Sequence, residues 1–132
     1  MMAIGACLLD THAALWWWCD SPMLGPQARE VIAATEIPMM VSVTSALEIS
    51  IKYRLGKLPD IGDPRESYGK LMARNGFKSL EITEGHAMKA GLLPGDHRDP
   101  FDRLIAAQAL IEGLTVVTRD PAFAAFGCDV IW

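Results

Sequence analysis

Short apolar runs alternate along this chain with longer segments in which apolar residues recur at helical spacing. The runs have the length and aliphatic content of buried strands and lie at residues 4–9, 39–43, 77–82 and 114–117. The spacing between them predicts helices over residues 11–18, 26–35, 44–55, 63–75, 83–90 and 100–112, then a short helix over 121–126 and an edge strand over 128–132. Strands that alternate with helices predict a three-layer α/β/α, Rossmann-like fold with a mainly parallel central sheet.

Capping residues and glycines mark the expected ends of these helices. Asp99 can cap the helix that begins at Pro100, and Gly113 can end it. Thr44 or Ser45 is expected to cap the helix over residues 44–55, and Ser45 with Glu48 fits a capping box. Glu48 therefore has a purely structural interpretation that competes with a chemical one.

The size and composition are those of one globular domain, which we place over residues 1–132. Hydrophobic residues make up 51% of the chain and charged residues 21%, and no apolar run approaches the roughly 18 residues of a transmembrane helix. No basic segment precedes the first apolar run, so we expect no secretion signal, no membrane association and a cytoplasmic location. The three cysteines and three histidines are too scattered for a zinc site or a disulfide framework.

Two further observations exclude classes of function. The net charge of −4 argues against a protein that holds nucleic acid by a broad basic surface. It does not exclude a nucleic-acid-binding protein whose acids are neutralised by a bound metal. Residues 10–18 contain no glycine, whereas a dinucleotide or P-loop site needs bare backbone at this turn.

Acidic residues follow several of the predicted strands or lie in the first turn of the next helix. In a parallel sheet the carboxyl ends of the strands share one edge, which is where ligands bind. Acids are also favoured there as helix caps, so each one alone has a structural explanation. Carboxylates without a serine elbow, a cysteine–histidine pair or a glycine-rich loop are suited to Mg²⁺ or Mn²⁺ and to attack of water on a phosphodiester. The acids expected at this edge are Asp10, Glu48, Asp102 and Asp120.

Four segments of the chain together resemble the motifs of the PIN-domain ribonucleases, and more narrowly those of the VapC-type toxins of type II toxin–antitoxin pairs. They are LLDTH at 8–12, SALEI at 45–49, HRDPFDRLIAAQA at 97–109 and VTRD at 117–120. The resemblance implies a PIN-like fold in which the same four acids are catalytic and bind the metal. It also implies that Thr118 supports the metal site, with Asp99 as a further motif residue.

The resemblance further implies an endoribonuclease that depends on Mg²⁺ or Mn²⁺, forms a homodimer, and is held inactive by a small VapB-like antitoxin. Basic residues near the motifs are candidates for contact with RNA phosphates, although isolated basic residues are also common as solvated surface charges. They are Arg54, Lys57, Arg98, Arg103 and Arg119. The run from Trp16 to Trp18 fits core packing, an antitoxin groove or a dimer contact.

Two other classes of function compete with this one. A receiver-like phosphoacceptor domain also gathers acids around Mg²⁺ at the edge of a parallel sheet, but it would need a lysine after the last strand and a single receiving aspartate in mid-chain. A non-catalytic PIN-like interaction module would keep the fold, and binding of divalent metal would distinguish it from the nuclease.

Overall fold

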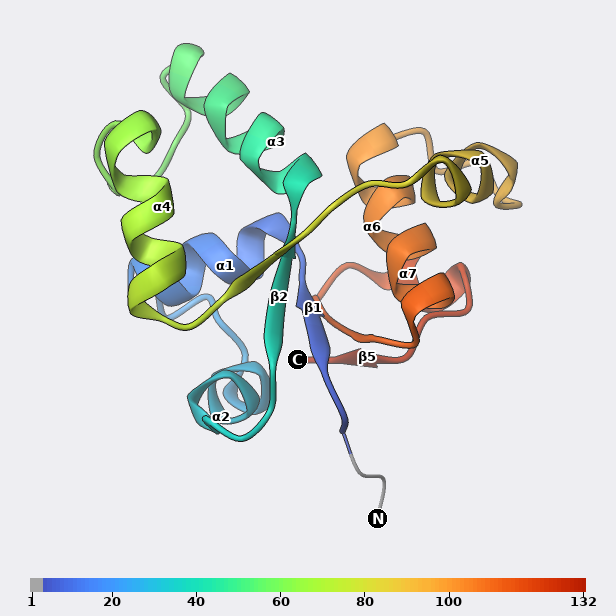
Figure 1. The fold of residues 1–132 in the computed structure, drawn as a ribbon, viewed down its shortest axis with the longest axis horizontal. Coiled ribbons are helices and arrows are strands. Elements are labelled where there is room, and N and C mark those ends of the chain that lie inside the picture. The colour runs from blue at the N-terminus through green and yellow to red at the C-terminus, as the bar shows by residue number, and fades with distance from the viewer. Residues whose placement is uncertain (1–3) are drawn as a thin grey trace.

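The computed structural model describes residues 4–132, and within them a five-stranded parallel sheet is covered by helices on both faces (Figure 1). The strands run in the order β3-β2-β1-β4-β5. They are β1 (Cys7–Leu9), β2 (Met39–Ser42), β3 (Lys78–Leu80), β4 (Thr115–Val117) and β5 (Val130–Ile131). The helices are α1 (Thr11–Trp18), α2 (Pro26–Ala33), α3 (Val43–Arg54), α4 (Pro64–Arg74), α5 (Glu84–Leu92), α6 (Pro100–Glu112) and α7 (Pro121–Ala125).

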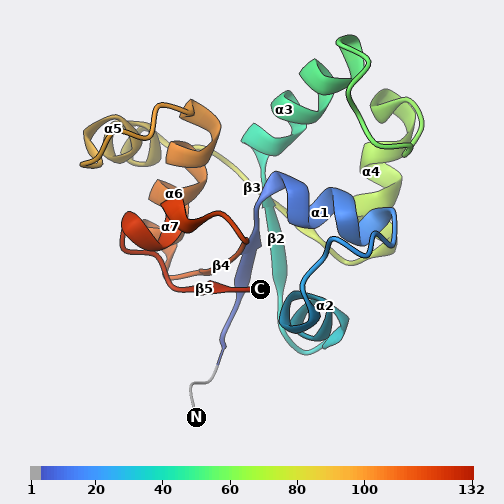
Figure 2. The same ribbon diagram turned by 180° about the vertical axis from the view of Figure 1, so that it is seen from behind.

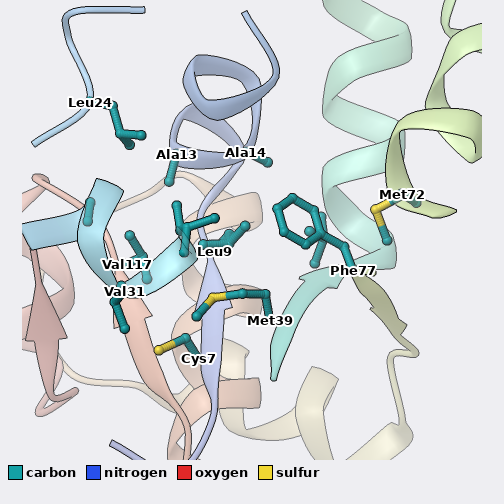
Figure 3. Close-up of a cluster of buried hydrophobic side chains, with 13 residues drawn as sticks. Cys7, Leu9, Ala13, Ala14, Leu24, Val31, Met39, Met72, Phe77 and Val117 are labelled. Carbon is teal, nitrogen blue, oxygen red and sulfur yellow. The ribbon is translucent and has the colours of Figure 1, made fainter. Parts of the chain in front are cut away.

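Two hydrophobic cores lie on the two faces of the sheet, because successive side chains of a strand point to opposite sides. Cys7 and Leu9 of β1 pack in the core under α1, α2 and α4, which Figure 3 shows with Phe77 and Met72. Leu8 points the other way, into the core formed with α5, α6 and α7. The views from front and back show the same division, with α1, α2 and α4 on one side of the sheet and α5 to α7 on the other (Figures 1 and 2). This is the predicted three-layer architecture.

The third helix begins earlier than the capping pattern predicts. Ser42 is its N-cap, and the Ser42 hydroxyl accepts a hydrogen bond from the backbone N–H of Thr44 at 3.1 Å. Ser45 lies inside the helix, where its hydroxyl bonds the hydroxyl of Thr11 at 2.8 Å and ties α3 to α1. The predicted cap at Thr44 or Ser45 is therefore wrong, and the capping box that would have given Glu48 a structural role does not form.

Other boundaries agree with the sequence to within a few residues. The first strand is confined to Cys7–Leu9 where residues 4–9 were expected, and α5 continues through Gly91 to Leu92. The expected caps Asp99 and Gly113 both occur, the latter with φ of 70°, a left-handed conformation that glycine adopts without strain. No helix in residues 4–132 is long and apolar enough to cross a membrane.

Candidate active site

A cavity of about 350 Å³ opens at the edge of the sheet where the parallel strands end. It gathers side chains that lie more than a hundred residues apart in the sequence, because β1, β2 and β4 are neighbours and all end there. It is lined by Asp10, Thr11, His12, Trp16, Glu48, Asp99, Asp102, Arg119, Asp120, Pro121 and Trp132. All four acids predicted for this edge, together with Asp99, therefore lie in one pocket.

Thr118 joins two of these acids. Leu9 pairs with Val117 across β1 and β4, so the next residues, Asp10 and Thr118, lie side by side. The Thr118 hydroxyl donates to Oδ2 of Asp10 at 2.5 Å and accepts from the backbone N–H of Asp120 at 3.0 Å. The register of the sheet thus places Thr118 where the resemblance expects a supporting hydroxyl.

Asp10 is almost completely buried, and this changes its acid–base behaviour. Its side chain is near the floor of the pocket, where the residue is 7% exposed. Burial raises its pKa from 3.8 to about 6, while hydrogen bonds from Thr118 and from the backbone of Ala13 lower it and the charges of Glu48 and Asp120 raise it further. An ionised Asp10 is costly here unless a positive charge is near.

Asp102 and Asp120 form a closer group with a histidine to which the sequence assigned no role. Each of the residues His97, Asp102 and Asp120 offers one potential ligand atom, and these atoms lie within 4.8 Å of one another. Nε2 of His97 is 2.9 Å from Oδ2 of Asp102. Burial, opposed by the hydrogen bond from His97 and reinforced by the charges of Asp99 and Asp120, raises the pKa of Asp102 to about 6. Within residues 4–132, Oδ1 of Asp102 and Oδ2 of Asp120 have no hydrogen-bond partner.

Glu48 reaches the same pocket from α3, and its position follows from the helix geometry. It lies on the face of α3 that also carries Lys52, whose ammonium is 3.9 Å from the Glu48 carboxylate. The pair is spaced i, i+4, and both side chains are less than one-third exposed. Glu48 is free of any capping duty and presents a carboxylate to the pocket.

Three pocket acids are helix caps as well. Oδ1 of Asp10 accepts from the N–H of Ala13 at 2.7 Å, and Oδ1 of Asp120 accepts from the N–H of Ala122 at 2.9 Å. Asp99 caps α6 through the N–H of Phe101. An acid can therefore cap a helix and also take part in the acidic pocket, because a carboxylate has a second oxygen and spare lone pairs on the first.

The donor set suits a hard divalent cation. Carboxylate oxygens are the ligands that Mg²⁺ and Mn²⁺ prefer, and an imidazole nitrogen is compatible with Mn²⁺. His97, Asp102 and Asp120 lie close enough to share one ion, and Asp102 and Asp120 each keep a carboxylate oxygen without a hydrogen-bond partner within residues 4–132. The residues present therefore fit the metal that the sequence predicts.

The basic residues proposed for RNA contact are placed differently from one another. Of the five, Arg119 lines the pocket, and its guanidinium carbon is 4.7 Å from the centre of the Trp16 ring. Arg54 lies at the exposed C-terminal end of α3 and does not line the pocket; neither do the exposed Lys57 and Arg98.

Arg103 is a correction to the sequence prediction. Its guanidinium turns away from the pocket and donates to the backbone carbonyls of Ala90, Leu93 and His97. It also lies over the ring of Phe126, 5.4 Å from its centre. These bonds use three of the five guanidinium N–H groups, one on each nitrogen, and Arg103 does not line the acidic pocket, so its role is to fasten the loop before α6.

The tryptophan run divides between the pocket and the core. Trp16 lines the pocket, whereas the Trp17 indole donates to Asn75 at 3.0 Å and the Trp18 ring meets the rings of Tyr68 and Phe77. Sequence reasoning missed His97, His12 and Trp132 as pocket residues. His97 belongs to the HRDPFD segment and could have been suspected from that; Trp132 carries no local signal.

Comparisons with known proteins agree with this geometry. Residues 7–127 match the PIN domain family. The chain is 30% identical over 114 residues to Ribonuclease VapC22 of Mycobacterium tuberculosis, covering 86% of this chain and 85% of that protein.

Two solved structures are similar in fold. VapBC2 of Rickettsia felis, bound to a DNA fragment from its promoter, superposes with a TM-score of 0.69 at 16% identity, covering 96% of this chain and 97% of that one. VapC20 of M. tuberculosis, a sarcin-ricin loop cleaving toxin, superposes with a TM-score of 0.67 at 16% identity, covering 92% and 95%. The resemblance seen in the four motifs is confirmed: the chain belongs to the PIN-domain family and is of the VapC type.

Proposed function

We propose that this protein is a Mg²⁺- or Mn²⁺-dependent endoribonuclease and acts as the toxin of a toxin–antitoxin pair. The observation that carries the proposal is the convergence of acids from four separate segments on one pocket, with Thr118 linking Asp10 to the backbone of Asp120. The likeness to Ribonuclease VapC22 supports RNA as the substrate.

In this proposal the chain's own residues hold the cation and orient the reactants. Asp102 and Asp120, with their unpaired oxygens, would hold the ion, and Asp10 and Glu48 would complete the negative site. The ion, when bound, would activate water and neutralise the charge of the cleaved phosphate. Thr118 fixes the orientation of the Asp10 carboxylate and favours its charged form. Neither serine nor cysteine lines the pocket, and the hydroxyl of Thr11, which does line it, is hydrogen-bonded to the hydroxyl of Ser45.

The sheet order argues against the receiver-like alternative. Receiver domains of the flavodoxin-like type have the order 2-1-3-4-5, whereas the strands here run 3-2-1-4-5. The non-catalytic alternative is disfavoured because every acid of the predicted quartet is present and faces the pocket.

The proposal includes a protein partner. VapC-type relatives are found in VapBC complexes, and we propose a small VapB-like antitoxin and a homodimer for this chain as well. Two exposed apolar side chains on α5, Met88 at 67% and Leu92 at 77%, support contact with another protein.

Cleavage of RNA by the purified, partner-free protein tests the enzymatic part. We expect cleavage with Mg²⁺ or Mn²⁺, none with excess EDTA, and recovery when metal is restored. Asp120→Asn should abolish cleavage, and the matched control Asp129→Asn, an exposed acid outside the pocket, should not. Undiminished cleavage in EDTA, or equal loss in both variants, would refute a metal mechanism at this site. Assaying transfer, ribosomal and messenger RNA side by side would identify the substrate.

Expression in a bacterial host tests the toxin part. The parent protein should slow growth, Asp120→Asn should not, and a co-expressed antitoxin should restore growth. A parent that cuts cellular RNA in vitro yet is harmless at high expression would disprove the toxin role and leave the nuclease intact.

A further inference from the structure

One wall of the acidic pocket is built from rings and an arginine. His12 and Trp16 lie one turn apart on α1, with ring centres 5.2 Å apart and planes inclined by 34°. The guanidinium of Arg119 lies over the Trp16 ring at 4.7 Å, and Trp132 meets the same ring edge-on at 5.8 Å. We call these four residues the aromatic wall; all of them line the pocket that holds the acids.

The wall is fixed from behind. The carbonyl oxygen of Trp132 accepts from the N–H groups of Gln27 and Ala28, both at 3.0 Å, and so caps the start of α2. Gly25 leaves room for this approach, because a Cβ there would lie 2.4 Å from the same oxygen and 2.6 Å from Cδ1 of the indole. Trp132 is therefore held in place as a backing for Trp16 before any ligand arrives.

Arg119 is held by the indole and keeps its donors free. It flanks Asp120 in the sequence, yet within residues 4–132 no carboxylate pairs with it and no acceptor takes a hydrogen bond from it. A guanidinium that stacks on an indole leaves its N–H groups directed outward, available to a ligand. Arg119 and His12 are the exposed members of the wall, and Trp16 and Trp132 are half-buried beneath them.

The charge of the pocket indicates which part of a nucleotide this wall can receive. Five carboxylates and one arginine line it, so a second phosphate would be repelled unless a metal intervened. A nucleobase is flat and uncharged, and stacks on histidine, aromatic rings and arginine planes. A base attached to the nucleotide whose phosphate is at the acids can reach the wall, because both lie in one cavity of about 350 Å³.

We propose that the aromatic wall is a subsite for one unpaired nucleobase beside the cleaved phosphate, with His12 and Arg119 as the stacking surface and Trp16 as the positioning residue beneath them. The inference rests on the proposed ribonuclease function and extends it to the recognition of a single base. A protein segment on the wall is the competing occupant.

Abasic substrates test this subsite. We would take an oligoribonucleotide that the parent cuts at one phosphate and remove the base on the 5′ side or the 3′ side, leaving the backbone intact. One of the two abasic substrates should raise KM about 10-fold, within the range reported for stacking of one base on an aromatic side chain, with little change in kcat. Unchanged KM for both abasic substrates would refute the subsite and leave the nuclease function standing.

Variants of Trp16 separate recognition from structure. Trp16→Ala should have the raised KM already with the intact substrate and lose little more with the abasic one, whereas Trp16→Phe should recover most of the parent's preference. Trp18→Phe, a core tryptophan of the same helix, is the matched control and should keep the full preference. An unchanged Mn²⁺-induced rise in melting temperature in Trp16→Ala would show that the metal site is intact. If Trp16→Ala instead raises KM by the same factor relative to the parent for the intact and the abasic substrate, Trp16 does not act through the base and the proposal is overturned.

A binding measurement keeps the two proposals distinguishable. Binding of the labelled oligonucleotides to Asp120→Asn by fluorescence anisotropy should show the same loss for the abasic form, even if no cleavage of RNA is found. If binding depends on the base but the parent protein does not cleave RNA, the proposed ribonuclease function is refuted and the base subsite stands. If Trp16→Ala instead leaves KM unchanged and abolishes binding of the cognate antitoxin, the wall belongs to the protein partner and the base subsite is wrong.

Discussion

Replacement of Asp102 by asparagine should stabilise the metal-free protein. Burial is the largest cause that raises the pKa of Asp102 from 3.8 to about 6, and its side chain is 21% exposed. A difference of roughly two pKa units corresponds to about 3 kcal/mol of disfavoured charge at neutral pH, which we take as an upper bound. Asparagine keeps an acceptor for His97 and removes the charge. We expect Asp102→Asn to be about 1–3 kcal/mol more stable than the parent at pH 8.

The pH dependence gives this prediction its sign. A carboxyl with a raised pKa binds its proton more tightly in the folded state, so Asp102 costs the parent stability progressively as pH rises from about 4 to about 7. The variant lacks this loss at position 102. Parent and variant should therefore be equally stable near pH 4 and differ fully above about pH 7.

Urea unfolding across this pH range, without metal and then with Mn²⁺, measures the stability of the metal-free proteins and their stabilisation by Mn²⁺. A ligand that binds only the folded state adds RT ln(1 + [L]/Kd), so loss of a metal ligand should remove most of the Mn²⁺-induced stabilisation. Asp63→Asn is the matched control of opposite sign, because hydrogen bonds from Arg65 hold the pKa of Asp63 below its usual range. If Asp102→Asn is less stable than the parent at pH 8 yet keeps the full Mn²⁺ effect, Asp102 is a structural first-turn acid and the metal-site assignment is wrong.

Further variants address other parts of the site and fold. Thr118→Val should cost about 2–4 kcal/mol, more above pH 6, because the buried Asp10 carboxylate and the part-buried N–H of Asp120 lose the hydroxyl and the pKa of Asp10 rises further; unfolding at pH 5 and pH 8 checks this. Arg103→Met should lower stability, whereas Arg119→Met should reduce the preference for the intact over the abasic oligonucleotide, which Arg103→Met should keep; binding titrations with both oligonucleotides compare them. Gly113→Ala should lower the free energy of unfolding by about 1 kcal/mol, since the residue has φ of 70°. Thermal unfolding measures this, and a variant as stable as the parent would contradict it.

The parts of the site that the sequence predicts are those fixed by the parallel sheet. Asp10 and Thr118 each follow a strand, and strand pairing alone brings them together. Glu48 and Asp102 lie in the early turns of helices that start at the same edge, so their approach also follows from alternating strands and helices. The positions of these residues needed no knowledge of the loops.

Features that depend on loop paths and side-chain direction could not be read from the sequence. His97 reaches Asp102 because the loop before α6 folds back, and Arg103 holds that loop by binding its carbonyls. Trp132 enters the pocket because β5 pairs at the far edge of the sheet and its carbonyl meets α2. Ser42, the last residue of β2, caps α3 because the helix begins directly after the strand, at Val43, and not at the capping motif that the sequence suggested.

The double use of carboxylates as helix caps and pocket acids offers a spectroscopic reporter of the site. The amides of Ala13 and Ala122 donate to Oδ1 of Asp10 and of Asp120, and a cation drawing electron density from those carboxylates would weaken both hydrogen bonds. Their nitrogen and proton chemical shifts should therefore follow metal occupancy in an ordinary two-dimensional NMR titration. Two backbone signals, neither belonging to a metal ligand's own side chain, would therefore report metal occupancy of the site in the absence of RNA.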